Sequence, residues 1–471
     1  MNHIDISEKA KLLGDEIRDY VAEMQAASFR PKTAADVLEY VKKQGIDSIR
    51  LWFTDLVGSL KMFAITPDEL AGAFKQGMGF DGSSIDGYQR INESDMVAFP
   101  LAVTARLIPF RIGPAKAICM FAETRNAKTG EAYADDPRNI LRRNLAAMKK
   151  VGFSQMNVGP EAEYFYFEND DEPSVIDKAG YFTLNPVDVG DSIRELTVLA
   201  LESMGINVEY HHHEVAPSQH EIDLKYCEAL EMADRLQTYK WLVKEIARRV
   251  GVHATFMPKP LAGENGSGMH THLSLWTNGK NAFYDKEGVH NLSKTAQSFV
   301  EGVLAQAQEL TLLTNPDYNS YRRLVPGFEA PVYVAWAGHN RSALVRIPEN
   351  KRGNESATRA EFRFPDASCN PYLAFSALLM AGLDGVKTKE KLRPEQKEDL
   401  YHLDSVAREE KNIAALPHDL YAAIKAAEGG SIVTETLGET AAKKLIELKL
   451  HEVDDYRLQV TKLELEKGLS L

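Results

Sequence analysis

Three short segments carry pairs of charged or histidine side chains two residues apart. The pairs are Glu161 and Glu163, His270 and His272, and Glu361 and Arg363. Side chains i and i+2 of a β-strand point to the same face, so each segment presents two polar groups on one side. Clustered carboxylates with few histidines favour a hard dication, Mg²⁺ or Mn²⁺. We expect three strands that wall one active site; the alternative is three unrelated amphipathic strands that face water.

The run from His211 to Glu221 contains a second set of candidate ligands. If Pro217-Ser218 is a two-residue turn, Glu214 lies opposite Glu221 across a hairpin, where like charges repel unless a metal ion separates them. The alternative is a surface hairpin with screened carboxylates. Consecutive histidines point to different faces and no cysteine lies nearby, so we expect at most one histidine of the run in the site.

A glycine-rich loop, Asn265-Gly266-Ser267-Gly268, leads into His270. Glycine allows a close approach of backbone to ligand, although an ordinary turn is the alternative. No Gly-Lys-Ser/Thr follows, which excludes a Walker loop.

Arginines are concentrated between residues 320 and 363, in a chain that is otherwise acidic. They are Arg322, Arg323, Arg341, Arg346, Arg352, Arg359 and Arg363. Arginine recognises carboxylates and phosphates, whereas for Arg322 and Arg352 surface salt bridges are the preferred interpretation. Arginines beside carboxylate-bound metals are typical of a nucleoside triphosphate site.

Length and composition limit the class of protein. The chain has 471 residues, which predicts two domains, and its net charge of −13 argues against a nucleic-acid or anionic-membrane binder. Cys119, Cys227 and Cys369 show no paired spacing, so a reducing cytoplasm is expected. We find no apolar run long enough to span a membrane.

The order of elements predicts an α+β fold with a small first unit. Residues 1–32 read as a polar helical arm, and residues 33–112 as helix, hairpin and helix followed by a glycine-dense loop. A boundary is predicted near Pro114, after which residues 113–471 mix strands with long helices at 136–151, 188–204, 227–250 and 293–313.

Several of these motifs, in this order, resemble type I glutamine synthetase of bacteria and archaea over nearly the whole chain. The motifs are Phe80-Asp81-Gly82-Ser83-Ser84, Glu93-Ser94-Asp95-Met96, Gly159-Pro160-Glu161-Ala162-Glu163, residues 211–216 (HHHEVA), Lys259-Pro260, residues 265–270 (NGSGMH), residues 323–331 (RLVPGFEAP) and Asn370-Pro371-Tyr372-Leu373. The resemblance implies a small β-grasp-like domain followed by a catalytic domain with a curved antiparallel sheet flanked by helices. It also implies ATP-dependent amidation of L-glutamate by ammonia through γ-glutamyl phosphate.

The resemblance also implies roles for individual residues. Two Mg²⁺ or Mn²⁺ ions would be bound, one by Glu163, Glu214 and Glu221 and the other by Glu161, His270 and Glu361. The ATP contacts would be His272, Arg341, Arg346 and Arg359 at the phosphates and Glu209 and Ser274 at the nucleoside. Glutamate would be bound by Asn265, Gly266, Arg323 and Arg363. Ammonium would be deprotonated by Asp81 in a pocket walled by Ser84 and Tyr181, and Glu329 would lie on a flap that closes over the intermediate.

The resemblance further implies two stacked hexameric rings, with the N-terminal unit completing a neighbour's active site. A regulatory tyrosine modified with AMP would correspond to Tyr401, with an adenylyltransferase or a small regulatory protein as partner. The chain departs from the pattern in the variable loop Ile85-Asp86-Gly87-Tyr88, where Tyr88 stands at a position that is usually aromatic, and over residues 349–358, where one basic ATP contact is in doubt.

Two rival functions remain at this point. One is a ligase of the same fold that uses a polyamine or ethanolamine, against which the retained ammonium-pocket residues argue. The other is a non-catalytic structural relative, which would be expected to lose metal ligands; all six are retained.

Overall fold

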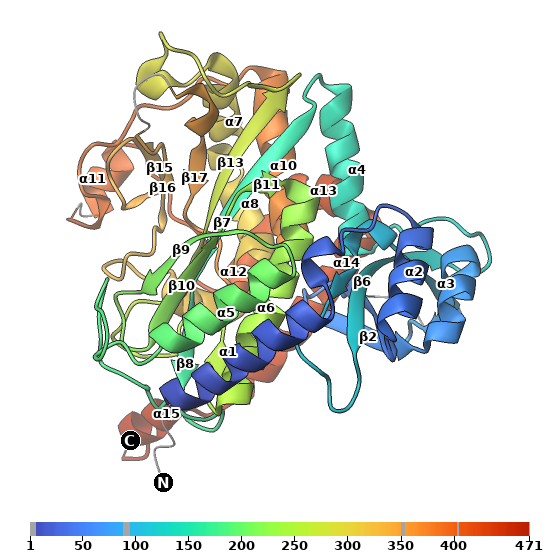
Figure 1. Ribbon diagram of the computed structural model, residues 1–471. Helices are drawn as coiled ribbons and strands as arrows, with labels where there is room; N and C mark the ends of the chain where they lie inside the picture. Colours follow the sequence, from blue (N-terminus) through green and yellow to red (C-terminus); the bar gives the residue numbers. More distant parts are fainter. Residues whose placement is uncertain (1–5, 88–94, 350–353, 403–404, 471) are drawn as a thin grey trace.

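A computed structural model describes residues 6–87, 95–349, 354–402 and 405–470. Tyr88, Glu93, Ser94 and Arg352, which were singled out above, lie outside these ranges. The described chain forms a small unit and a larger one (Figure 1). The prediction of an α+β fold with a small unit first is therefore confirmed. No helix among the described residues is long and apolar enough to cross a lipid bilayer.

The small unit is a six-stranded sheet covered by two helices. Its strand order is β2-β1-β6-β4-β3, with β5 paired to β6. The elements are β1 (Ser48–Thr54), β2 (Leu60–Ile65), β3 (Met78–Asp81), β4 (Asp95–Pro100), β5 (Arg106–Leu107), β6 (Ala117–Asn126), α2 (Ala34–Gln44) and α3 (Leu70–Gln76). Helix α2 begins at a capping box: the Thr33 side chain accepts from the backbone N–H of Asp36, and the Asp36 side chain accepts from the backbone N–H of Thr33. The predicted helix start at Thr33 is therefore confirmed.

The predicted boundary at residue 112 falls inside this unit. Strand β6 pairs in parallel with β1 and antiparallel with β4, so the first sheet continues to Asn126. Gly113 and Pro114 form a tight turn, with Ile112 paired to Ala115, and do not form a linker. Glycine and proline mark turns and linkers alike, and the sequence alone does not separate the two.

The large unit contains a seven-stranded and a four-stranded sheet. The first has the order β11-β7-β13-β17-β16-β15, with β14 paired to β13, and the second has the order β12-β8-β10-β9. The strands are β7 (Gln155–Ala162), β8 (Tyr164–Phe167), β9 (Val208–His213), β10 (Gln219–Leu224), β11 (Cys227–Glu228), β12 (His253–Thr255), β13 (Met269–Thr277), β14 (Lys280–Asn281), β15 (Tyr333–Ala337), β16 (Ala343–Arg346) and β17 (Ala360–Phe362). All pairs are antiparallel except β15 with β16.

Helices pack against both sheets and bury the core. They are α1 (Ile6–Glu23), α4 (Pro137–Lys150), α5 (Asp191–Ser203), α6 (Ala229–Val250), α7 (Lys294–Ala305), α8 (Ala307–Thr314), α9 (Ser320–Arg323), α10 (Pro371–Thr388), α11 (Ser405–Glu410), α12 (Leu420–Gly429), α13 (Ile432–Leu437), α14 (Glu439–Arg457) and α15 (Lys462–Gly468). Helix α10 is buried almost throughout, which fits its apolar sequence.

Two predicted helical features differ from the structure. The helix expected over 293–313 is interrupted at Gln306, which separates α7 from α8. The N-terminal helix is not a free arm: α1 lies along α5 and buries Leu13, Ile17 and Tyr20 (Figure 1).

Candidate active site

A carboxylate–histidine cluster spans three adjacent strands of the seven-stranded sheet. Glu161 on β7, His270 on β13 and Glu361 on β17 offer ligand atoms that all lie within 4.8 Å of one another. Strand β13 lies between the other two, and His270 is paired directly with Glu161. His272 Nε2 lies 2.7 Å from Glu161 Oε1. The structure thus brings these three predicted ligands together through strand register.

Cationic neighbours surround this first cluster. Burial alone would raise the pKa of Glu161, but His272 and His270 outweigh burial and hold that pKa well below its usual range. Burial also opposes ionisation of Glu361, yet His272 and Arg363 lower its pKa to about 2. Arg346 Nη1 donates to Glu361 at 2.7 Å and Arg363 Nη1 at 2.5 Å. Glu361 is therefore a buried anion that arginines hold in place.

A second cluster lies at the β9–β10 hairpin. His212, Glu214 and Glu221 have ligand atoms within 4.8 Å of one another. Glu163 adjoins them electrostatically and accepts hydrogen bonds from Gln219 Nε2 at 2.9 Å and from the backbone N–H of Gly268 at 2.8 Å. Only His212 of the three-histidine run belongs to this cluster.

Among the described residues, no lysine or arginine forms an ion pair with Glu214 or Glu221, and the basic group beside them is His212, whose pKa burial lowers. Burial and the neighbouring Glu163 raise the pKa of Glu214 to about 9. Burial, with Asp223 and Glu161 next, raises the pKa of Glu221 well above its usual range. A bound dication would reverse both effects, because it favours the ionised carboxylates. The donor set of carboxylates and one histidine fits Mg²⁺ or Mn²⁺.

The predicted register of this hairpin was wrong by two residues. His213 pairs with His220, and the backbone N–H of Glu214 donates to the carbonyl of Gln219, so Gln219 lies opposite Glu214. Residues 215–218 form the loop, rather than a turn of two residues. Glu221 instead faces His212, which brings the two carboxylates together from either side of that ring.

Glu161 and Glu163 also do not share one strand. Strand β7 ends at Ala162, and the chain crosses at Glu163 into β8 of the other sheet. The i, i+2 argument therefore does not apply to this pair. The crossing instead places Glu161 with the first cluster and Glu163 beside the second.

A cavity of about 400 Å³ adjoins the first cluster. Its lining includes the predicted nucleotide residues Glu209, His272, Ser274 and Arg359 together with Glu161. Arg359 Nε donates to His272 Nδ1 at 3.1 Å. Arg346 and Arg341 do not line it: the first binds Glu361, and the second is exposed near Tyr181.

Two buried arginines, Arg323 and Arg363, lie close to the glycine loop. Arg323 donates to the backbone carbonyls of Phe364 at 3.1 Å and Arg363 at 3.2 Å. A Cβ at Gly266 would lie 2.2 Å from the Pro258 carbonyl oxygen, and one at Gly268 would lie 2.7 Å from Arg323 Nη2. Glycine is therefore required at positions 266 and 268, because neighbouring atoms leave no room for a Cβ. The same loop contains Asn265.

The predicted flap lies near the second cluster. Glu329 is exposed, has a left-handed backbone (φ 54°) and contributes to the raised pKa of Glu214. The Tyr401 hydroxyl donates to the carbonyl of the next flap residue, Ala330, at 2.9 Å. Tyr401 is half-buried, and burial raises its pKa to about 12.

Asp81 and Ser84 stay apart from both clusters within one chain. They lie at the edge strand β3 of the first sheet and in the loop after it, and both are exposed. Figure 1 places that unit on the opposite side of the molecule from β9 and β10. Tyr181, by contrast, lies close to Glu214 and Glu221 and is 50% exposed.

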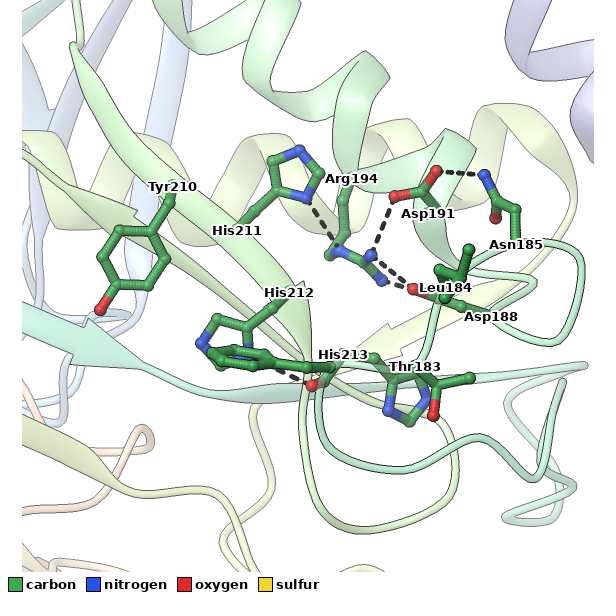
Figure 2. Close-up of a pocket in the computed structure, with 11 residues that line it drawn as sticks. Thr183, Leu184, Asn185, Asp188, Asp191, Arg194, Tyr210, His211, His212 and His213 are labelled. Carbon is green, nitrogen blue, oxygen red and sulfur yellow. Dashed lines mark hydrogen bonds and ion pairs between the residues drawn. The ribbon is translucent and has the colours of Figure 1, made fainter.

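A buried arginine supports the second cluster from behind (Figure 2). Arg194 on α5 is 2% exposed and forms ion pairs with Asp188 at 2.6 Å and Asp191 at 3.1 Å. It also donates to Nδ1 of His211 at 3.1 Å and to Nδ1 of His220 at 2.8 Å. These bonds fix the strands that carry His212 and Glu221.

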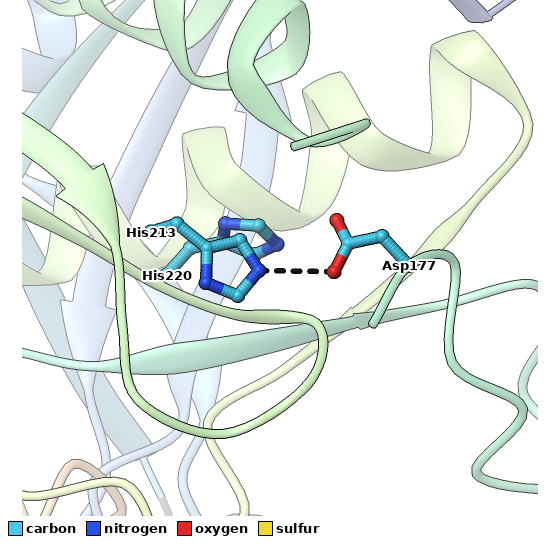
Figure 3. Close-up of side chains that lie close together, drawn as sticks. All are labelled: Asp177, His213 and His220. Atoms are coloured by element: carbon cyan, nitrogen blue, oxygen red, sulfur yellow. Dashed lines mark hydrogen bonds and ion pairs between the residues drawn. The ribbon is translucent and has the colours of Figure 1, made fainter. Parts of the chain in front are cut away.

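A third cluster, Asp177, His213 and His220, has the residue types of a metal site, but three of its four ring nitrogens are engaged by other protein groups (Figure 3). His213 uses Nδ1 toward the Glu214 carbonyl at 2.6 Å and Nε2 toward Asp177 at 2.9 Å. His220 accepts from Arg194 at Nδ1, so its hydrogen lies on Nε2 and leaves no lone pair for a metal there. The cluster therefore positions Glu214.

Sequence reasoning missed two buried residues of the site. Asp223 is 4% exposed, lines the 400 Å³ cavity and has a pKa raised to about 7 by burial and Glu161. Gln219 bonds both Glu163 and the carbonyl of Gly266. The i+2 spacing from Glu221 could have indicated both, since all three lie on β10.

Comparisons with known proteins agree with this geometry. The glutamine synthetase β-Grasp domain family matches residues 45–125, and the glutamine synthetase catalytic domain family matches residues 134–468. Glutamine synthetases of Halobacterium salinarum and Thermotoga maritima are each 43% identical to the chain, over 92% and 93% of it and 96% and 100% of their own lengths.

Solved structures extend the likeness to the fold. A complex of GmaS with ADP aligns with a TM-score of 0.84 at 30% identity and covers 92% of this chain and 99% of its own. Plasmodium falciparum glutamine synthetase aligns with a TM-score of 0.83 at 28% identity, over 93% and 99%. Carboxylate clusters, a nucleotide-sized cavity and near full-length relatives together identify an ATP-dependent glutamate–ammonia ligase, and the chain belongs to the glutamine synthetase family.

Proposed function

We propose that catalysis in this chain uses two divalent cations and a base supplied by a neighbouring subunit. Glu161, His270 and Glu361 would hold one cation, and Glu163, Glu214 and Glu221 the other. The observation that carries this proposal is geometric: ligand atoms of Glu161, His270 and Glu361 lie within 4.8 Å of one another, as do those of His212, Glu214 and Glu221. The raised pKa values of Glu214 and Glu221 support it, because an added cation would favour their ionised forms. When bound, such cations supply charge neutralisation and Lewis acidity at phosphate oxygens.

The remaining groups divide between ATP and glutamate. Glu209 and Ser274 would bind the nucleoside, and His272, Arg341, Arg346 and Arg359 the phosphates. Asn265, Gly266, Arg323 and Arg363 would hold glutamate so that its side-chain carboxylate attacks the γ-phosphoryl group. Arginine suits both tasks, because its planar fork matches carboxylate and phosphate oxygens.

The amide-forming step needs ammonia rather than ammonium. Asp81 would remove the proton, with Ser84, Tyr181 and Glu329 around the cation, and Glu329 would close over γ-glutamyl phosphate to exclude water. Because Asp81 and Ser84 are remote from the clusters of their own chain, we place them in the active site of the next subunit.

We propose an assembly of two hexameric rings. The exposed apolar side chains of the C-terminal segment support an assembly: Leu458 is 79% exposed, Val460 67% and Leu469 81%. Exposed apolar side chains gathered in one segment mark contact surfaces. Modification of Tyr401 by an adenylyltransferase stays a prediction, and it would require the hydroxyl to leave Ala330.

Product analysis tests the function. The assembled protein, with Mg²⁺, ATP and glutamate, is expected to release phosphate and form glutamine with ammonium, and to react poorly with putrescine or ethanolamine. Preferential turnover of putrescine or ethanolamine would instead support a γ-glutamyl-amine ligase. Phosphate release that no amine accelerates would contradict both.

A further inference from the structure

A large cavity lies outside the candidate active site. Its volume is about 640 Å³, and it is formed between the β1–β2 hairpin of the small unit, helix α6 and the segment 255–258. Gln237 Nε2 fixes this junction by donating to the Gly58 carbonyl at 3.1 Å. Cavities of a few hundred Å³ are the size that small-molecule ligands occupy.

One wall of the cavity carries lysines without carboxylate partners. Lys240 and Lys244, one helical turn apart on α6, each place Nζ 5.8 Å from the centre of the Phe256 ring. Among the described residues, neither lysine forms an ion pair within 4.0 Å, and Lys240 Nζ donates only to the carbonyl of Cys369 at 3.1 Å. Burial lowers the pKa of Lys240 to about 8, with Lys244 adding repulsion.

The acidic groups nearby are already engaged. Asp317 lines the cavity, but its carboxylate accepts from the backbone N–H of Asn319 at 2.6 Å. Asp366, close behind Lys240, accepts from Ser368 at 2.6 Å and Asn315 at 3.0 Å. The lining carries three cationic side chains, Arg50, Lys240 and Lys244, against one carboxylate, Asp317, so the cavity presents a net positive face.

Much of the remaining lining is aromatic and apolar. Trp52 and Trp241 are in edge contact with ring centres 5.1 Å apart, and Met62, Met257 and Pro258 complete the wall. Arg50, on the same face of β1 as Trp52, has a buried Nε that finds no hydrogen-bond partner in the part of the chain that the structure describes. Two adjacent cations facing aromatic rings suit a ligand with an anionic head and a flat apolar body.

We propose that this cavity binds a small planar organic anion, an aromatic carboxylate or aryl phosphate, independently of ATP and glutamate. Its anionic head would lie between Lys240 and Lys244, and its ring against Trp52 and Trp241. The site is connected to the glycine loop, because the Pro258 carbonyl in its wall accepts from the backbone N–H of Ser267 at 2.8 Å. Occupancy would therefore alter the loop that carries Asn265 and Gly266.

Calorimetric titration of the assembled protein with indole-3-acetate and with phenyl phosphate tests the proposal. ADP, Mg²⁺ and glutamate are kept saturating so that the active site is filled. We expect saturable binding of at least one of the two anions, with the tighter one identifying the head group. The neutral analogue indole-3-acetamide is expected to bind about tenfold more weakly or worse, because it lacks the charge-assisted contacts.

Variants locate the site. Lys244→Gln, on an exposed helix position, and Lys240→Met should each weaken binding about tenfold, whereas the matched surface control Lys42→Gln should not. Trp241→Phe should remove most of the fluorescence change on binding. Three results would each overturn the proposal: no saturable binding of either anion, equal binding of the amide, or unchanged affinity in Lys244→Gln. If Lys240→Met does not fold, the result for Lys244→Gln is decisive.

Discussion

At the scale of single residues, the two carboxylate clusters differ in what balances their charge. Glu361 is held ionised by Arg346 and Arg363, whereas the half-buried Glu214 and the buried Glu221 lie among other acids. Without a bound cation, the raised pKa values of Glu214 and Glu221 favour the protonated carboxyl groups. This difference makes the metal dependence of the site measurable through protons as well as through activity.

Cation binding should release protons near neutral pH. Glu214 has a pKa of about 9 without metal, so a cation must displace its proton, and metal affinity should rise with pH up to that value. Because the folded-state pKa of Glu214 is raised, the protonated carboxyl group stabilises the metal-free fold at low pH. This contribution is lost as pH rises from 4.5, the ordinary pKa of the group, to about 9. We expect the melting temperature of the metal-free protein to fall as pH rises from 4.5 to about 9, and added Mg²⁺ to restore it.

Calorimetry of Mg²⁺ binding in buffers of different ionisation enthalpy counts the released protons. Glu214→Gln, which cannot carry the proton, is the matched control and should release fewer. A proton count of zero in the unmodified protein would contradict the proposed role of Glu214.

Asp81→Asn removes the proposed base while keeping the side-chain shape. Loss of a general base costs about 10²–10⁴-fold in rate, so glutamine synthesis should fall by that order. Formation of γ-glutamyl phosphate, trapped chemically, should be partly retained because the clusters are intact. Asp86→Asn, an exposed position in the same loop, is the control; normal turnover and ammonium saturation in Asp81→Asn would refute the role.

At the scale of elements, the sequence predicted which strands carry the site but not how they meet. Period-two spacing identified β13 and β17, because both remain regular strands. It failed at Glu163, where the chain changes sheets, and at Glu214, where a longer loop sets the register. Both depend on long-range pairing, which local sequence does not encode. The roles proposed for individual site residues came from the family resemblance, whereas the places of Asp223 and Gln219 in the site became evident only from the structure.

The glycine loop should not tolerate a methyl group. In Gly266→Ala the new Cβ would meet the Pro258 carbonyl at 2.2 Å and force the loop away from Arg323. We expect a rise in KM for glutamate of at least about tenfold, as for loss of a charge-assisted contact. Gly72→Ala, in helix α3 with nothing within 4 Å, should leave KM unchanged and add about 0.5–1 kcal/mol of stability.

A hydrogen bond joins the flap residue Ala330 to Tyr401, which lies in the short helical segment Leu400–His402. Tyr401→Phe removes the bond to Ala330, worth about 0.5–1.5 kcal/mol, and should let the flap open more often. Water would then reach the acyl phosphate, so the ratio of phosphate released to glutamine formed should rise above one. Tyr421→Phe, at a 48% exposed tyrosine, is the control, and an unchanged ratio in Tyr401→Phe would argue against this coupling.

At the scale of the whole molecule, the chain separates its proposed base from its proposed cations. Asp81 belongs to the small sheet, while all six proposed metal ligands lie in the large unit. Contact between Asp81 of one chain and the clusters of another would complete the site. Oligomerisation would then be a requirement of catalysis, beyond its effect on stability.

Complementation between two inactive variants tests this claim most directly. Asp81→Ala and Glu361→Ala subunits should each be inactive alone, and differential tags would show that co-expressed subunits enter the same assembly. Some interfaces then join a sound small unit to a sound metal site, and glutamine synthesis should reappear in those mixed assemblies. Mixed assemblies whose activity stays at the level of either parent would show that the site is built within one chain.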